Sequence, residues 1–252
     1  MSEAMSAEFD TVAEWTAEVA RDLGPDFWIP AGCRGSGNPA ALDWLVDELE
    51  LRTGESLLDC GAGVGGPAAY AAQLRDVAPV LIDPERGACR AARSLFGYPA
   101  AQASAARLPV DDETFDAAWC LGVLCTMPDQ SDLLTELRRV VRAPGRIGLL
   151  VFLAEVELSP EDQPEGNHFP TEESLQQLLS VAGLTVVRRR KTADLPEIPA
   201  SWQSKVDAVE DALRRRHGHE QAWRVSEKQS DEMGRLLGEG LVTGHVLSLR
   251  GS

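Results

Sequence analysis

A cluster of glycines directly after a short apolar stretch is the feature that most restricts the fold. Residues 57–67 read Leu-Leu-Asp-Cys-Gly-Ala-Gly-Val-Gly-Gly-Pro, and an alanine-rich stretch continues to Leu74. Gly61 and Gly63 permit a tight turn that a ligand can approach closely, and Gly65 or Gly66 lets the following helix approach the sheet. The pattern predicts an apolar strand that turns into a helix and binds a ligand at the turn.

The rest of the chain alternates strand-like apolar runs with longer helical stretches. This order indicates an α/β fold, with a mainly parallel sheet covered by helices on both faces. Helices are expected after the N-cap Asn38, starting at Pro39, and over residues 129–141. The expected strands span residues 56–60, 79–83, 99–102, 115–121, 146–153, 184–190 and 242–249.

The 252 residues suit a single domain with modest elaborations. We assign residues 39–190 to a cofactor-binding core and residues 242–252 to the final strand. Residues 1–38 combine an amphipathic stretch with a turn-rich piece at residues 29–38, which fits either a lid over a ligand or a plain exposed loop. Residues 191–241 are longer than a simple crossover helix, and we interpret them as an inserted helical cap.

One apolar stripe runs along the predicted cap. Trp202, Val206, Val209 and Leu213 recur at intervals of three and four residues, as on one face of a helix. We expect this stripe to pack against the sheet or a neighbouring helix, ahead of any contact with substrate.

Charge and cysteine content exclude several classes of partner. The net charge of -16 and the pI near 4.7 disfavour binding to DNA or RNA, which requires Lys and Arg to neutralise phosphates. The five cysteines show no paired metal-ligand spacing, so neither a disulfide framework nor a metal site is expected. No apolar run approaches the length of a membrane span, and the acidic N-terminus does not resemble a signal sequence. We therefore expect a cytoplasmic protein.

Two aspartates near the glycines narrow the choice of ligand. Gly61, Gly63 and Gly66 also satisfy the dinucleotide pattern GxGxxG, so the glycines alone leave an NAD site open. Asp59 lies directly before them, where a carboxylate would repel a pyrophosphate but suits a ligand with an ammonium and a sulfonium. Asp83 ends the second expected strand and can accept hydrogen bonds from two ribose hydroxyls, although it also suits an N-cap. The pair favours S-adenosylmethionine over NAD.

Together these motifs resemble the class I S-adenosylmethionine-dependent methyltransferase family over residues 57–153, and more loosely to the C-terminus. Residues 59–65 are similar to the family's acidic-x-Gly-x-Gly-x-Gly motif. Residues 107–116 resemble its Leu-Pro turn before strand four, and residues 133–145 its helix and proline-glycine turn before strand five. The resemblance implies a sheet of order 3-2-1-4-5-7-6 with an antiparallel last strand, and a cofactor at the carboxyl ends of strands one, two and four.

The resemblance also implies a set of cofactor contacts. Many relatives bind the adenine amino group through an Asp before the Leu-Pro turn, and Ser104 occupies that position here. Adenine recognition is therefore left to Ser104, to the backbone around Ala105 and Ala106, or to another residue. The positions expected to contact S-adenosylmethionine are Asp59, Gly61, Gly63, Gly65, Asp83, Pro84, Ser104, Ala105 and Leu121.

Methyl transfer from a sulfonium needs alignment and desolvation more than it needs acid–base groups. Many relatives carry a histidine near the methyl donor, where this chain has residues 121–126 and no histidine. His168 lies in the loop after the fifth expected strand, so it is our candidate general base, although a surface or loop-stabilising role also fits it.

These observations predict a methyltransferase that acts on a small-molecule acceptor at an O, N or C atom. The alternative is a protein of the same fold that binds the cofactor without transferring a methyl group, as a ligand sensor or pericyclic catalyst. An NAD-dependent oxidoreductase is disfavoured by Asp59 and by the pattern of residues 108–116.

Overall fold

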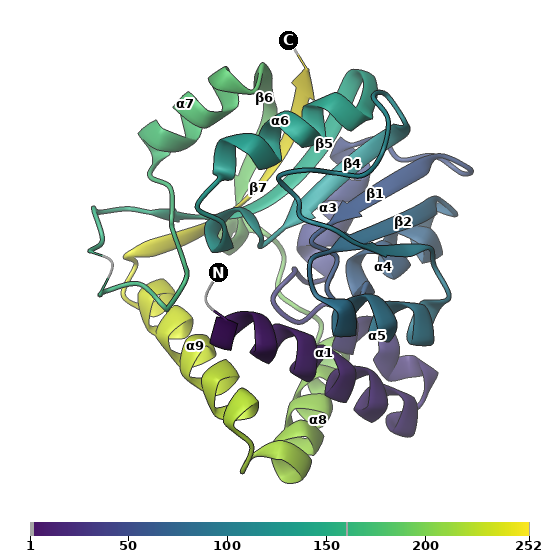
Figure 1. The fold of residues 1–252 in the computed structure, drawn as a ribbon, viewed down its shortest axis with the longest axis vertical. Helices are drawn as coiled ribbons and strands as arrows, with labels where there is room; N and C mark the ends of the chain where they lie inside the picture. Colours follow the sequence, from purple (N-terminus) through teal and green to yellow (C-terminus); the bar gives the residue numbers. More distant parts are fainter. Residues whose placement is uncertain (1–2, 160, 252) are drawn as a thin grey trace.

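A computed structural model of the chain describes residues 3–159 and 161–251. Seven strands form one sheet of order β3-β2-β1-β4-β5-β7-β6 (Figure 1). Strands β1 to β5 are parallel, whereas β7 pairs antiparallel with both β5 and β6. The predicted α/β fold and strand order are thus confirmed. The strands are β1 (Ser56–Cys60), β2 (Ala78–Asp83), β3 (Ala100–Gln102), β4 (Phe115–Leu121), β5 (Val141–Ala154), β6 (Leu184–Lys191) and β7 (Val242–Gly251).

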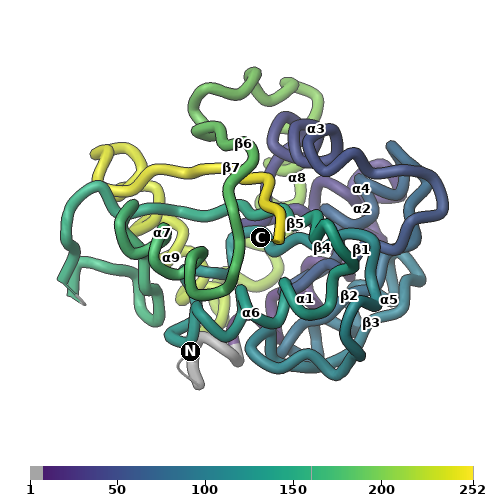
Figure 2. Tube along the Cα trace, turned by 90° about the horizontal axis from the view of Figure 1, so that it is seen from above, coloured from purple at the N-terminus to yellow at the C-terminus, as the bar shows by residue number. Residues whose placement is uncertain are grey.

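The central strands are buried on both faces because successive side chains point in opposite directions. Leu57 belongs to a buried cluster that includes residues of α3 (Pro39–Glu48) and α4 (Gly66–Arg75). Leu58 belongs to a second cluster, which extends to α6 (Gln130–Val140) and α7 (Glu172–Val181). Helix α5 (Arg86–Phe96) contacts β2 and β3 on the face of α4. Figure 2 shows α3 and α4 on one side of the sheet and α6 on the other.

Most predicted element ends agree with the structure within two residues, and local chemistry explains the agreement. The Asn38 side chain accepts a hydrogen bond from the Ala41 backbone N–H at 3.1 Å, which is the expected N-cap. The clearest difference is β5, which begins at Val141 instead of residue 146 because Val141 pairs with Phe115 ahead of a register shift.

The turn-rich interpretation of residues 29–38 is wrong for its first half. Helix α2 spans Trp28–Gly32 and follows a short 3-10 turn, η1 (Pro25–Phe27). The two backbones meet closely where α2 crosses the start of α4, since a Cβ atom on Gly66 would lie 2.2 Å from the Gly32 carbonyl carbon. This contact between distant segments favours the helix over the turns that the sequence suggests locally.

Three further helices lie together beyond the carboxyl ends of the strands (Figure 1). They are α1 (Glu3–Leu23), α8 (Ala200–His217) and α9 (Gln221–Gly238). Val12 of α1, Leu213 of α8 and Trp223 of α9 belong to one buried apolar cluster. We call α1, α8 and α9 the helical cover. Two residues of the predicted apolar stripe on α8, Val209 and Leu213, belong to this cluster. A third, Trp202, makes an edge-to-face contact with Tyr70 of α4.

Two short 3-10 turns complete the described elements, η2 (Leu124–Thr126) after β4 and η3 (Thr192–Asp194) after β6. All five cysteines are buried and free. Within residues 3–159 and 161–251, none of the helices combines the length and apolarity needed to cross a membrane. The same residues contain no cluster of three or more His, Cys, Asp or Glu side chains that could hold a metal ion.

Candidate functional site

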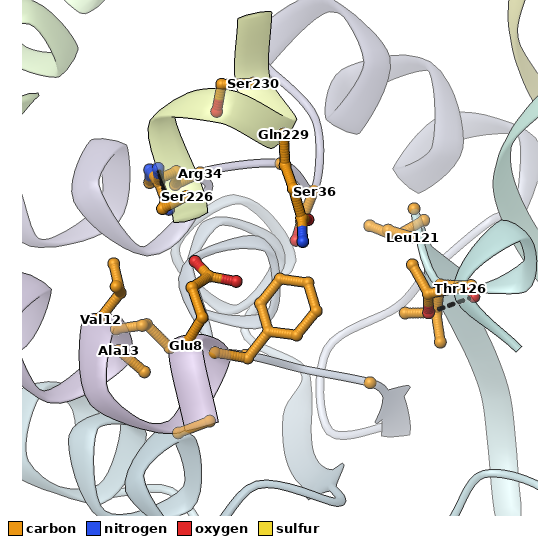
Figure 3. Close-up of a pocket in the computed structure, with 18 of the residues that line it drawn as sticks. Glu8, Val12, Ala13, Arg34, Ser36, Leu121, Thr126, Ser226, Gln229 and Ser230 are labelled. Carbon is orange, nitrogen blue, oxygen red and sulfur yellow. Dashed lines mark hydrogen bonds between the residues drawn. The ribbon is translucent and has the colours of Figure 1, made fainter. Parts of the chain in front are cut away.

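A cavity of about 530 Å³ lies between the carboxyl ends of β1, β2 and β4 and the helical cover (Figure 3). The glycine turn and the strand ends form one wall, with Gly61, Gly63, Asp83, Pro84, Leu121 and Val123. The helical cover and the turn after α2 form the opposite wall, with Glu8, Phe9, Val12, Arg34, Ser226 and Met233. The volume is typical of sites that enclose small organic ligands, roughly 300–1,000 Å³.

The glycine turn lines the cavity at two of its predicted positions. Gly61 has a φ of +76°, and a Cβ atom there would lie 2.3 Å from Val123 Cγ2, so only glycine fits. No atom lies within 4 Å of a Cβ built on Gly63, which leaves its backbone open to a ligand. Gly65 lies outside the cavity lining. It is the N-cap of α4, and its α-carbon faces Leu81, which fits a packing role.

Asp83 connects the end of β2 to the glycine turn and lines the cavity beside Pro84. Its Oδ2 accepts a hydrogen bond from the Gly63 backbone N–H at 2.8 Å, and its Oδ1 accepts one from the Glu85 N–H at 2.9 Å. Each carboxylate oxygen can accept a second bond, so both can still bind hydroxyl groups. Burial raises the pKa of the Asp83 carboxyl to about 6.

Asp59 is 1% exposed and lies at the end of β1, just outside the residues that line the cavity. Its Oδ2 atom is buried and has no hydrogen-bond partner among the described residues. Burial raises the pKa of this carboxyl to about 7. A buried carboxylate oxygen without a partner is costly, and a cation or hydrogen-bond donor on a bound ligand would relieve that cost.

The predicted adenine contacts are less well placed. Leu121, at the end of β4, lines the cavity, whereas Ser104 and Ala105 do not. The Ser104 side chain is exposed and its hydroxyl accepts a bond from the Ala106 N–H, while Ala105 is buried in the core below. Contacts of Ser104 and Ala105 with a cofactor stay a prediction without support from the cavity.

His168 is exposed, and the cavity lining includes its neighbour Asn167 but not His168 itself. Its backbone binds the loop to the segment after β4 and to α6. The His168 N–H donates to the Cys125 carbonyl at 2.6 Å, and the His168 carbonyl accepts from Gln130 Nε2, also at 2.6 Å. These bonds fit the loop-stabilising role that the sequence left open. A catalytic role for His168 stays a prediction, and none of the described residues that line the cavity is a histidine.

The sequence did not reveal the polar cluster on the covered side of the cavity. Arg34 Nε donates to Glu210 Oε1 at 2.9 Å, and an Arg34 terminal nitrogen donates to Ser226 Oγ at 2.5 Å. Glu8 is 2% exposed and lies against the same pair. These residues lie in α1, the turn after α2, α8 and α9. Of these residues, only Arg34 lies in the turn-rich piece at residues 29–38, which the sequence indicated as part of a possible lid.

Comparison with known proteins agrees with this geometry. Residues 58–149 match the family model described as a methyltransferase domain. Over 122 residues, the chain is 37% identical to 27-O-demethylrifamycin SV methyltransferase from Amycolatopsis mediterranei. The aligned region covers 44% of this chain and 43% of that protein. The chain thus aligns with less than half the length of this relative, and the same holds for a second curated relative, at 40%.

Solved structures share the fold over more of the chain. The cyclopropane synthase MmaA2 from Mycobacterium tuberculosis superimposes with a TM-score of 0.66 at 16% identity and covers 93% of this chain and 97% of that chain. The cyclase SpnF superimposes with a TM-score of 0.65 at 20% identity, covering 83% of this chain and 79% of that chain. At these identities the likeness concerns the fold alone.

Proposed function

We propose that the chain is a class I S-adenosylmethionine-dependent methyltransferase, and that it transfers the methyl group of S-adenosylmethionine to an O, N or C atom of a small molecule. One observation carries the proposal: a single cavity joins the glycine turn and Asp83 to a largely apolar wall from the helical cover and the turn after α2, which also includes the charged side chains of Glu8 and Arg34. Such a cavity can hold the reactive end of the cofactor and an acceptor side by side, which the reaction requires.

The residues of the first wall fit the chemical groups of this cofactor. Gly63 leaves open space beside its α-carbon for close contact, and Asp83 retains acceptor capacity for the ribose hydroxyls. Just behind this wall, the unpartnered Oδ2 of Asp59 would receive the ammonium of the amino-acid end through a water molecule. When bound, S-adenosylmethionine supplies a methyl group already activated by its sulfonium.

The chain's own part in the reaction is alignment and exclusion of water. The acceptor atom must approach the methyl carbon opposite the sulfur, so that its bond to carbon forms as the carbon–sulfur bond breaks and the electron pair moves to sulfur. Phe9, Val12 and Met233 exclude water from that region. A proton lost by a hydroxyl or amine acceptor would pass to a cavity carboxylate or to solvent, since the described lining offers no imidazole.

Methyl transfer is tested with labelled cofactor. We expect purified protein to transfer labelled methyl from S-adenosylmethionine to some members of a panel of hydroxylated and amino small molecules, each product being heavier by one methylene. Asp83→Ala should abolish the product, and Asp132→Ala, an exposed aspartate on α6, should not. Protein that binds the cofactor yet methylates no member of a broad panel would favour the non-methylating alternative.

Further parts of the proposal come from the sequence. Residues 1–38 would act as a lid segment and residues 191–241 as a cap, around a cofactor-binding core at 39–190 and a final strand at 242–252. The partner would be a small-molecule acceptor, with no role for nucleic acid or membrane, and the location would be cytoplasmic. The close packing of α1 with α8 and α9 supports a joint role for the lid and the cap.

A further inference from the structure

Glu8 is a buried carboxylate whose hydrogen bonding is incomplete. It lies on α1, lines the cavity and is 2% exposed. Its Oε2 atom has no partner among the described residues. Figure 3 shows its carboxylate near the Arg34 and Ser226 pair, with the Gln229 side chain across from it. A chain that buries an acid in this way usually provides a partner for it, so the missing partner points to a ligand.

Arg34 does not supply that missing partner. Its Nε is bound to Glu210 at 2.9 Å and a terminal nitrogen is bound to Ser226 Oγ. The guanidinium also lies 5.7 Å from the centre of the Trp223 ring. Glu8 and Glu210 therefore share one cation, and the ionised cluster carries one negative charge in excess. Burial raises the pKa of the Glu8 carboxyl, while Arg34 and the Ser226 hydroxyl partly offset the rise.

The wall around Glu8 combines polar and apolar side chains, because Thr16 of α1 and Gln229 and Ser230 of α9 line the cavity beside the apolar residues. Phe9, Val12 and Ala13 of α1 face the cavity together with Met233 and Leu237 of α9. These side chains offer neither strong donors nor charges to a ligand. A molecule that fills this part of the cavity must therefore place apolar groups against these side chains and one donor group against the unsatisfied carboxylate of Glu8.

We propose that the small-molecule acceptor is an amine with a largely apolar skeleton, and that Glu8 Oε2 binds its ammonium group. An amine nitrogen that is itself methylated first gives up a proton to Glu8 or to solvent, which frees the lone pair that attacks the methyl carbon. The amine neutralises the excess charge of the cluster and provides the hydrogen bond that Oε2 lacks. This inference rests on the proposed function, because the acceptor must occupy the covered side of the cavity while the cofactor occupies the glycine side.

Simple amphipathic probes test this selectivity. We would titrate wild-type protein at pH 7 with n-octylamine, n-octanol and octanoate by calorimetry, with and without saturating S-adenosylhomocysteine. The ammonium probe should bind about tenfold tighter than the alcohol, or more, and octanoate should bind weakest. Glu8→Gln should remove the preference for the amine. Glu14→Gln removes the same charge from a partly exposed position of α1 that lies outside the cavity lining and pairs with Arg90, and it should keep the preference.

A second variant separates ligand binding from folding. Glu8→Met replaces the acid with an apolar side chain of similar length, so we expect a melting temperature equal to or above that of the wild type, together with loss of amine preference. A large loss of stability would assign Glu8 to the fold and overturn the proposal. Equal binding of amine and alcohol by the wild type, or a preference that persists in Glu8→Gln, would also overturn it.

The titrations with and without S-adenosylhomocysteine distinguish failure of the amine proposal from failure of the proposed function. Amine binding that persists with S-adenosylhomocysteine bound supports an acceptor site. Direct competition would place Glu8 in the cofactor site and overturn the inference alone. Failure of S-adenosylhomocysteine to bind wild-type protein would instead contradict the proposed function, whatever the amine does.

Discussion

The Gly63 backbone N–H donates a hydrogen bond to Asp83 Oδ2 at 2.8 Å, which ties the glycine turn to the carboxyl end of β2. The bond joins the two motifs that the sequence indicated separately. It holds the Gly63 backbone and a carboxylate at fixed positions on the same wall of the cavity.

Removal of this carboxylate should weaken cofactor binding strongly. Asp83→Ala loses both the ribose contact and the bond to the turn, so the Kd for S-adenosylhomocysteine should rise about 10–100-fold. Calorimetry measures the change, with Asp132→Ala as an exposed control. An unchanged Kd would exclude Asp83 from the cofactor site.

Binding of S-adenosylhomocysteine should depend on pH through Asp59. Its pKa is about 7 without ligand because the carboxyl is buried, and the ammonium of the ligand prefers the ionised form. Affinity should therefore be full near pH 8 and fall as the pH drops toward 6.5, where the carboxyl takes up a proton. Asp59→Asn should bind weakly and show a flat profile in that range. A wild-type Kd independent of pH would contradict this role.

Substitution at Gly61 should disrupt the turn by two separable effects. Gly61→Ala places a Cβ against Val123 and imposes a side chain on a φ of +76°, which together should destabilise the fold by about 2–4 kcal/mol. Adding Val123→Ala relieves the contact but not the backbone strain, so thermal or urea unfolding should show partial recovery. Full recovery in the double variant would show that the φ carries no cost.

His245 should make stability fall at mildly acidic pH. It is 2% exposed, and burial, with Arg189 beside it, lowers its pKa to about 4. Below pH 6.5 the imidazole of His245 is protonated in the unfolded chain but stays neutral in the folded chain. Its contribution to the free energy of unfolding therefore drops by about 1–3 kcal/mol between pH 6.5 and 4.

The variant His245→Gln isolates this contribution from those of other groups. It should remove the corresponding part of the slope in urea unfolding measured across that range. His219→Gln, at an exposed histidine, should leave the slope unchanged. The prediction fails when both variants give the wild-type slope.

The sequence indicated the parts of the fold and site that depend on neighbouring residues. The strand before Gly61, the N-cap at Asn38 and the acid at the end of β2 are local patterns, and the strand order followed from the resemblance to a known family. The polar cluster is different because Arg34 and Ser226 are 192 positions apart and meet only when the helical cover folds over the sheet. A buried Glu8 in an amphipathic helix likewise looks like any surface acid until its neighbours are known.

The central claim is tested most directly by calorimetric titration of the purified wild-type protein with S-adenosylhomocysteine and with NAD. The account predicts saturable binding of S-adenosylhomocysteine at one site and no binding of NAD. Binding of NAD without S-adenosylhomocysteine would contradict it, because the glycine turn, Asp59 and Asp83 would then serve a dinucleotide.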